Sequence, residues 1–211
     1  MPLNLLAKKI SESCENRISA RSKEQEAIRT AVIAFNARFS ELELVLGNLL
    51  SAIINIKDSK IAHAIYYSPT SFDARSEIIT NAIIQIATER HALAGLLLHW
   101  EKISEKIGQS RRLRNAIAHG SLLNISIGKT VHARLSPPAF DVIRVGRKIA
   151  KRQVPGLTAS DINRGIQNLI LLFECTNQVI QLLTEFHEGN LSLQGRYDEL
   201  KQGVAKLTRQ Q

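Results

Sequence analysis

One short stretch of the sequence combines a histidine, an amide and several arginines. It reads Arg111-Arg112-Leu113-Arg114-Asn115-Ala116-Ile117-Ala118-His119-Gly120. An arginine binds phosphate through paired hydrogen bonds and keeps its charge. A histidine changes its charge near neutral pH and can therefore move protons. These groups are the ones needed to cleave RNA without a metal ion: an acid or base for the 2′-hydroxyl or the leaving oxygen, and a cation for the charged phosphorane.

Helical geometry decides which of these side chains can meet. At about 100° per residue, Asn115 and His119 lie about 40° apart on one face of a helix. Arg111 and Arg112 flank this face one turn earlier and are candidate RNA-binding residues. Arg114 lies about 140° from His119, on the apolar side. A charge on an apolar face needs a partner. Glu43 borders the apolar face of an earlier helix, so we predict a Glu43–Arg114 ion pair.

A straight helix does not present Arg114 and His119 to one point. Three alternatives remain open from the sequence: the helix loosens before Gly120, Arg114 is partly structural, or a second chain completes the site. A simpler interpretation is that the whole stretch is a basic helix end that complements the helix dipole.

Heptad-spaced apolar residues predict the helices that position this stretch. The first stripe continues for about 25 residues without a proline and predicts a long helix over about residues 22–56, after a shorter helical piece over about 3–18. Its members are Ile28, Val32, Phe35, Phe39, Leu42, Leu46, Leu49 and Ile53. A second helix begins after Thr70, which is a candidate cap, and a third runs from about Thr88 to Gly120.

The segment over about residues 121–157 has a different pattern. It is richer in β-branched residues and turn formers, and it predicts a small β-hairpin or extended insertion. A last long helix reaches about residue 188, and a polar tail over 189–211 is either a short helix or frayed. The predicted fold is all-α: a four-to-five-helix bundle, in one domain over 1–211 with its core at about 22–188.

Composition and charge narrow the partners. The chain has 28 Lys and Arg against 19 Asp and Glu, a net charge of +9, which favours an anionic partner such as RNA. The insertion contains a basic run without an acid, which is either a phosphate-binding patch or a solvated surface. Its members are Arg144, Arg147, Lys148, Lys151 and Arg152.

Several classes of protein are not indicated. No spacing of histidines, cysteines and carboxylates predicts a metal site, and no glycine motif for nucleotides predicts a cofactor. No apolar run is long enough to span a membrane. The N-terminus does not resemble a signal peptide, and two distant cysteines suit a reducing cytosol, so we expect a cytoplasmic protein.

The segment Arg114–His119 matches R-x(4)-H with a polar residue directly after the arginine, and so resembles the signature of the HEPN superfamily. Asn115–Gly120 is similar to the common RNxxAHG form, and Phe39–Glu43 to the acidic segment of the family's first long helix. The resemblance spans about residues 24–188, within which these two short motifs are the specific part. It implies a metal-independent ribonuclease, usually a homodimer in which the two motifs meet across a cleft.

The resemblance also implies residue roles and partners. Arg114, Asn115 and His119 would form the active-site set, and Glu43 would be the supporting acid. Many members of the superfamily are toxins or phage-defence effectors, some pair with nucleotidyltransferase-like antitoxins, and some are not catalytic. The leading hypothesis is therefore a HEPN-type endoribonuclease. The alternative is a non-catalytic module of the same fold that binds nucleic acid or protein.

Overall fold

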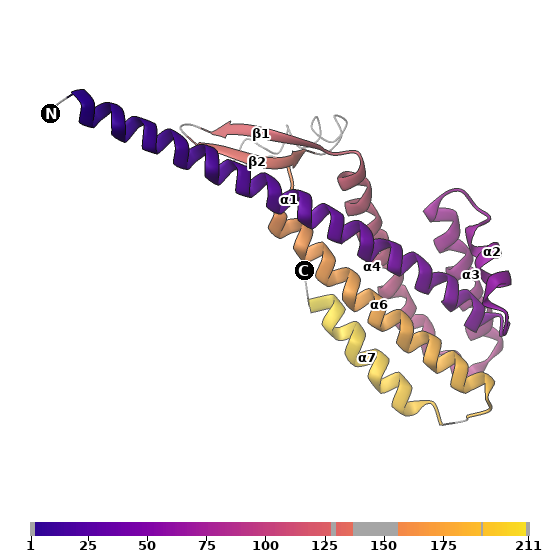
Figure 1. Cartoon of the computed structure of the whole chain (residues 1–211). Coiled ribbons are helices and arrows are strands. Elements are labelled where there is room, and N and C mark those ends of the chain that lie inside the picture. The colour runs from indigo at the N-terminus through magenta and orange to yellow at the C-terminus, as the bar shows by residue number, and fades with distance from the viewer. Residues whose placement is uncertain (1–2, 128–129, 137–155, 191, 210–211) are drawn as a thin grey trace. The chain divides into compact units, whose positions relative to one another are not determined.

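The computed structural model describes residues 3–127, 130–136, 156–190 and 192–209. Two strands, β1 (Ser121–Ile127) and β2 (Thr130–Ser136), form an antiparallel hairpin. The rest is mainly helical: α1 (Leu3–Ile53), α2 (Ser59–Tyr67), α3 (Phe72–Glu89), a short 3-10 turn η1 (His91–Leu93), α4 (Leu96–Ala118), α6 (Ala159–His187) and α7 (Gln194–Arg209). The predicted helical bundle with a hairpin between the third and last long helices is confirmed at this level (Figure 1).

The chain divides into two compact units. One contains residues 1–36 and 113–165, and the other contains residues 37–112 and 166–211. Helices α1, α4 and α6 each contribute to both units. The division of the chain into one domain over 1–211 therefore stays a prediction, and each unit is described by itself below.

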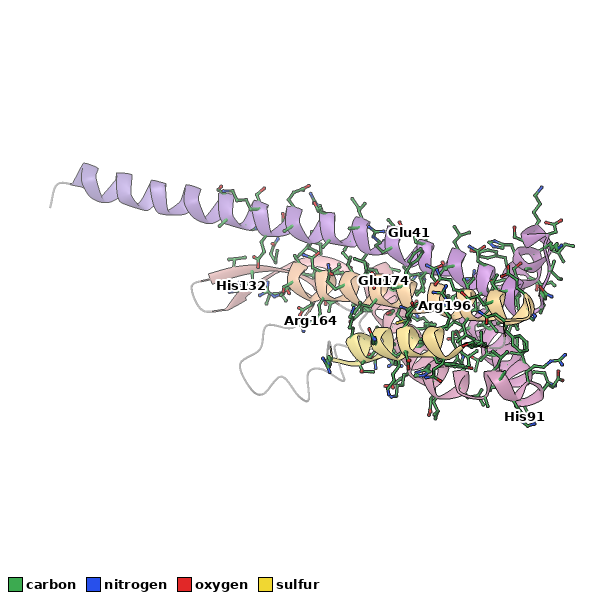
Figure 2. The ribbon with its side chains drawn as sticks, turned by 90° about the horizontal axis from the view of Figure 1, so that it is seen from below. Glu41, His91, His132, Arg164, Glu174 and Arg196 are labelled. Atoms are coloured by element: carbon green, nitrogen blue, oxygen red, sulfur yellow. The ribbon has the colours of Figure 1, made fainter. Side chains whose placement is uncertain are left out.

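The larger unit is a helical bundle around the C-terminal half of α1. Its core residues come from every helix of the unit and include Leu42, Leu46, Leu49, Tyr66, Ile79, Ile83, Leu96, Trp100, Ile103, Leu172, Leu183, Leu200 and Val204. The α7 helix, which carries Arg196, packs beside α6 (Figure 2). Arg196 Nε donates to Glu185 Oε1 of α6 at 2.7 Å. The polar tail is thus a packed helix over most of its length, because Leu200, Val204 and Leu207 form one buried stripe.

The smaller unit joins the hairpin to the N-terminal part of α1. The hairpin lies beside this part of α1, and Gln25 Nε2 donates to Asn124 Oδ1 of β1 at 3.0 Å (Figure 1). The side chains enclosed here are Ile28, Ala31, Phe35, Ile117, Ala133, Leu135 and Ile162. None of the helices that the structure describes has an apolar stretch long enough to cross a membrane.

Helix boundaries differ from the prediction at three places. The α1 helix is continuous from Leu3, so the separate piece predicted over 3–18 is wrong. The α2 helix was not predicted; Asp58 caps it by accepting a hydrogen bond from the backbone N–H of Lys60 at 2.9 Å. At α3 the cap is Ser71 and not Thr70, because Ser71 Oγ accepts a hydrogen bond from the backbone N–H of Ala74.

Candidate functional site

The C-terminal end of α4 carries the three motif residues. Asn115 lies in the last turn of the helix, and His119 follows directly after Ala118. The backbone N–H of His119 donates to Asn115 O at 3.1 Å, which continues the helical turn past the end of α4. The side chains of Arg114, Asn115 and His119 are all exposed. One helical turn separates the amide from the imidazole, and all three side chains are open to a large ligand.

The sequence predicted that Arg114 lies on an apolar face of its helix, but the structure shows its side chain exposed. Its NH1 atom is 3.4 Å from Asn115 Oδ1. The inner positions at this end of α4 belong to Leu113, which packs against Gly165 of α6, and to Ile117, which is 4% exposed. Positions 113 and 117, and not position 114, therefore face inward at this end of α4. Arg114 consequently needs no buried acidic partner.

Glu43 has a different partner from the one predicted. Its Oε1 atom lies 2.9 Å from NH2 of Arg75 on α3, and both side chains are largely buried. The Arg75 guanidinium carbon lies 5.3 to 5.9 Å from the ring centres of Tyr66, Tyr67 and Phe72, a cation–π arrangement. The carboxylate that was predicted to pair with Arg114 has Arg75 as its partner within its own unit.

The two tyrosines of this cluster stay neutral at physiological pH. Burial raises the pKa of Tyr66, whose hydroxyl is enclosed and has no hydrogen-bond partner among the described residues. Burial and the nearby Glu43 carboxylate both raise the pKa of Tyr67. Neither phenol is therefore a base near neutral pH. Sequence analysis missed this cluster, although three aromatic residues close to one arginine signal it.

The predicted RNA-binding residues differ in their surroundings. Arg111 NH1 forms an ion pair with Asp73 of α3, while Arg112 is exposed. The basic run of the insertion lies outside the described residues. It comprises Arg144, Arg147, Lys148, Lys151 and Arg152.

The residue after His119 must be a glycine. A Cβ atom on Gly120 would lie 2.6 Å from Ala116 O and 2.9 Å from Ser136 O. The backbone of β2 thus approaches the end of α4 closely, and a side chain at this position would push the two apart. The structure confirms the predicted end of the helix just before Gly120.

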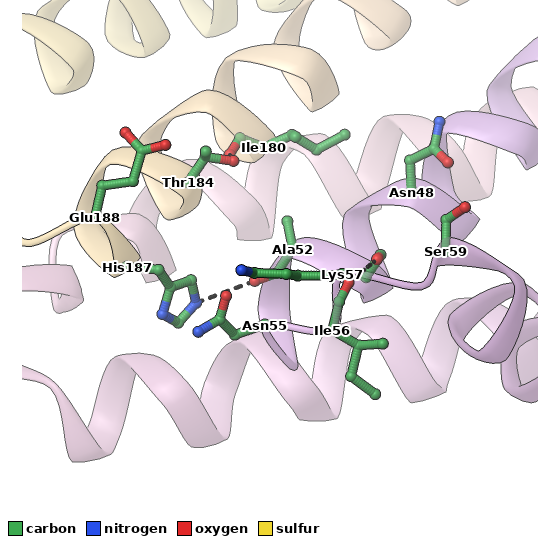
Figure 3. Close-up of a pocket in the computed structure, with 11 residues that line it drawn as sticks. Asn48, Ala52, Asn55, Ile56, Lys57, Ser59, Ile180, Thr184, His187 and Glu188 are labelled. Carbon is green, nitrogen blue, oxygen red and sulfur yellow. Dashed lines mark hydrogen bonds between the residues drawn. The ribbon is translucent and has the colours of Figure 1, made fainter.

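A cavity of about 510 Å³ lies between the C-terminal ends of α1 and α6 (Figure 3). In it, His187 Nε2 is 3.0 Å from Ala52 O and Ser51 Oγ donates to Ile56 O at 2.8 Å. Exposed Asn55, Lys57 and Glu188 complete its polar rim. One of these hydrogen bonds links α6 to the end of α1, and the other holds the turn that follows α1. None of the motif residues lines the cavity.

The described residues provide neither a metal site nor, at Cys175, a reactive thiol. No group of three histidine, cysteine or acidic side chains there could hold a metal ion. Burial raises the pKa of the Cys175 thiol to about 11, so this cysteine is not a nucleophile.

The chain was compared with known protein families, with curated proteins and with solved structures, and none of them matches it.

Proposed function

We propose that this chain is a metal-independent endoribonuclease of the HEPN type, acting as a toxin or phage-defence effector. The observation that supports this proposal is the intact R-x(4)-H motif on the exposed end of α4, with Arg114, Asn115 and His119 open to solvent. A basic chain with a net charge of +9 suits RNA as the substrate.

The proposed chemistry is a transesterification within RNA. His119 takes the proton of a 2′-hydroxyl, the 2′-oxygen attacks the adjacent phosphorus, and the bond to the 5′-oxygen breaks. The products are a 2′,3′-cyclic phosphate and a 5′-hydroxyl that receives a proton from an imidazolium or from water. Arg114 stabilises the extra negative charge of the phosphorane, and Asn115 orients the phosphate through its amide.

A homodimer is part of this proposal. The motif residues lie on an open surface, whereas phosphoryl transfer needs groups that converge on one phosphate with water partly excluded. A two-fold axis near Asn115 would bring two such surfaces together. We expect a dimer in light scattering at micromolar concentration; a monomer at that concentration would contradict a composite site. A nucleotidyltransferase-like antitoxin is the partner that the proposal implies.

The deciding experiment is RNA cleavage by the purified protein in EDTA. The wild type is expected to cut RNA, His119→Ala is expected to lose at least about a hundredfold in rate, and Arg114→Ala a comparable amount. The matched control is His91→Ala, because His91 is an exposed histidine far along the chain from the motif. Equal cleavage by wild type and His119→Ala, or no cleavage by wild type on any RNA, would contradict the proposal.

The second candidate is a non-catalytic module of the same fold that binds nucleic acid or protein. The observation that favours it is the openness of the motif, since the cavity between the ends of α1 and α6 contains none of the motif residues. This candidate predicts RNA binding that weakens steeply with salt while the RNA remains intact.

A further inference from the structure

The outer edge of β2 is held from two sides. In an antiparallel hairpin, alternate residues of each strand point their backbone N–H and C=O groups away from the partner strand. In β2, the outward groups of Ala133 and Leu135 both have partners. The N–H of Ala133 donates to Glu24 Oε2 of α1 at 2.9 Å. Leu135 exchanges two backbone hydrogen bonds with Leu157, at 2.8 and 3.0 Å.

Glu24 contacts β2 through both of its carboxylate oxygens. Its second oxygen, Oε1, accepts from NH1 of Arg134 at 2.7 Å, and the same NH1 also donates to Ala133 O. Burial raises the pKa of Glu24, but the hydrogen bonds from Ala133 and Arg134 outweigh it, so that pKa lies below its ordinary value. One carboxylate thus joins α1 to both the backbone and a side chain of β2, and it does so in its ionised form.

The position of β2 is transmitted to the end of α4 through backbone contacts. Ser136 at the end of β2 pairs with Ser121 at the start of β1. Ser136 O also lies 2.9 Å from the place where a Cβ of Gly120 would be. Because Gly120 directly follows His119, a shift of β2 toward α4 would push on the backbone next to the imidazole.

From these contacts we infer that Glu24 is a positioning residue for His119: it fixes β2 against α1, and β2 fixes the turn that aims His119. The inference rests on the proposed function, since it assigns a role in orienting the proposed proton-transfer group. It does not make Glu24 a catalytic residue, because Glu24 acts through β2.

The chain provides a matched control for a test. Glu26 lies two residues further along α1, is exposed, and forms a 3.9 Å surface pair with Arg29. Three variants are compared with the wild type: Glu24→Ala, which removes both hydrogen bonds; Glu24→Gln, whose amide oxygen can still accept from Ala133; and Glu26→Ala. For each variant, kcat and KM are measured for RNA cleavage in EDTA, and the His119 imidazole resonance is followed by NMR, assigned with His119→Ala.

We expect Glu24→Ala to lower kcat by about tenfold or more with little change in KM, because misplacing a reacting group by about 1 Å has effects of this size. The His119 resonance should shift in Glu24→Ala, shift less in Glu24→Gln, and stay unchanged in Glu26→Ala. An unchanged kcat and His119 resonance in Glu24→Ala, with only a lower melting temperature, would overturn the inference and leave Glu24 a purely stabilising residue.

The two readouts separate this inference from the proposed function. If the wild type does not cleave RNA, the proposed function fails, and the NMR comparison still decides whether Glu24 positions His119. If Glu24→Ala does not fold, Glu24→Gln and Arg134→Gln replace it, since each removes the ion pair and leaves an acceptor at position 24 for the Ala133 N–H. In that case a His119 resonance identical to that of the wild type in both variants overturns the inference.

Discussion

The Glu43–Arg75 ion pair is enclosed by aromatic rings. The side chains of the two partners are 20% and 15% exposed, and three rings surround the guanidinium. A second acid on the same helix, Glu41, pairs with Arg38 at the surface, where the side chains are 46% and 50% exposed. The two pairs have the same chemistry and differ in solvent exposure. They therefore allow the contribution of burial to be measured directly.

Glu43→Gln should lower the free energy of unfolding by about 3 kcal/mol, because it leaves the Arg75 charge buried without its partner. Glu41→Gln should lower it by less than about 1 kcal/mol, since exposed ion pairs contribute little. Chemical denaturation of the two variants and the wild type measures both values. Similar values for the two variants would show that Arg75 is not confined by its aromatic surroundings.

At the scale of single residues, the sequence predicted the place of a residue on its own helix more readily than its interaction partner on another helix. The motif spacing placed Asn115 and His119 one helical turn apart, and the structure agrees. Arg75 was not predicted as the partner of Glu43, because the angle of a residue on its helix does not tell which helix faces it. Arg75 lies on a helix whose start depends on the Ser71 cap, and the sequence analysis placed that cap one residue too early.

At one glycine of α6, neighbouring helices approach the backbone closely. At Gly165 of α6, an added Cβ would collide with Leu113 of α4 and lie 3.0 Å from Phe35 of α1. At Gly108, in the middle of α4, an added Cβ would meet nothing within 4 Å. Both glycines are helical and differ in what surrounds them. The first is required by packing, while the second only weakens its helix.

Gly165→Ala should lower stability by about 1–3 kcal/mol, because the extra methyl group forces neighbouring side chains apart. Gly108→Ala should raise stability by about 0.5–1 kcal/mol, because it reduces the conformational freedom of the unfolded chain without a clash. Thermal unfolding followed by circular dichroism compares the two. A stabilising Gly165→Ala would mean that α6 does not approach α4 as closely as the structure shows.

At the scale of elements, apolar periodicity predicted the long helices and missed the short one. The stripe from Phe39 to Ile53 is buried at each heptad position, so its period alone was sufficient. The α2 helix was not found because its apolar residues cover two faces: Ala62 and Tyr66 are buried, while Ile61 and Ile65 are exposed. Such a helix has no single apolar stripe to detect. The predicted break before residue 22 was wrong because no glycine or proline interrupts that part of α1.

Several carboxylates throughout the molecule are stabilised in their ionised form. Burial raises the pKa of Asp161, but hydrogen bonds from the hydroxyl and backbone N–H of Thr158 outweigh it, and that pKa is lowered. The hydrogen bond from Arg196 lowers the pKa of Glu185. The pKa of Glu24 is also lowered, because its carboxylate accepts hydrogen bonds from Ala133 and Arg134. These groups lie on α1 and α6 and belong to both units.

These shifts predict loss of stability in acid. A carboxyl group whose pKa is lower in the folded state binds fewer protons there than in the unfolded state. Its contribution is therefore present above the unfolded pKa of about 4 and is lost as the pH falls through the folded pKa. The midpoint of urea unfolding should stay level from pH 7 to about 5 and decrease below about pH 4. Glu24→Gln should show a smaller decrease over that range, and an identical decrease would mean that Glu24 is not ionised through its contact with Arg134.

The paired hydrogen bonds between Leu135 and Leu157 have a consequence for protein engineering. They bring the two ends of the basic insertion to one point, so the chain leaves and re-enters the fold at adjacent residues. Closing a loop whose ends are already fixed depends only weakly on its length, at about 0.6 kcal/mol for each doubling. The intervening segment can therefore be shortened, exchanged or replaced by a reporter domain, provided that Gly156 is kept, because its φ of +99° and close approach to Leu135 O suit only glycine. Leu135 and Leu157 thus mark a natural graft point, at which the segment between them can be changed while the backbone pairing that holds β2 is kept.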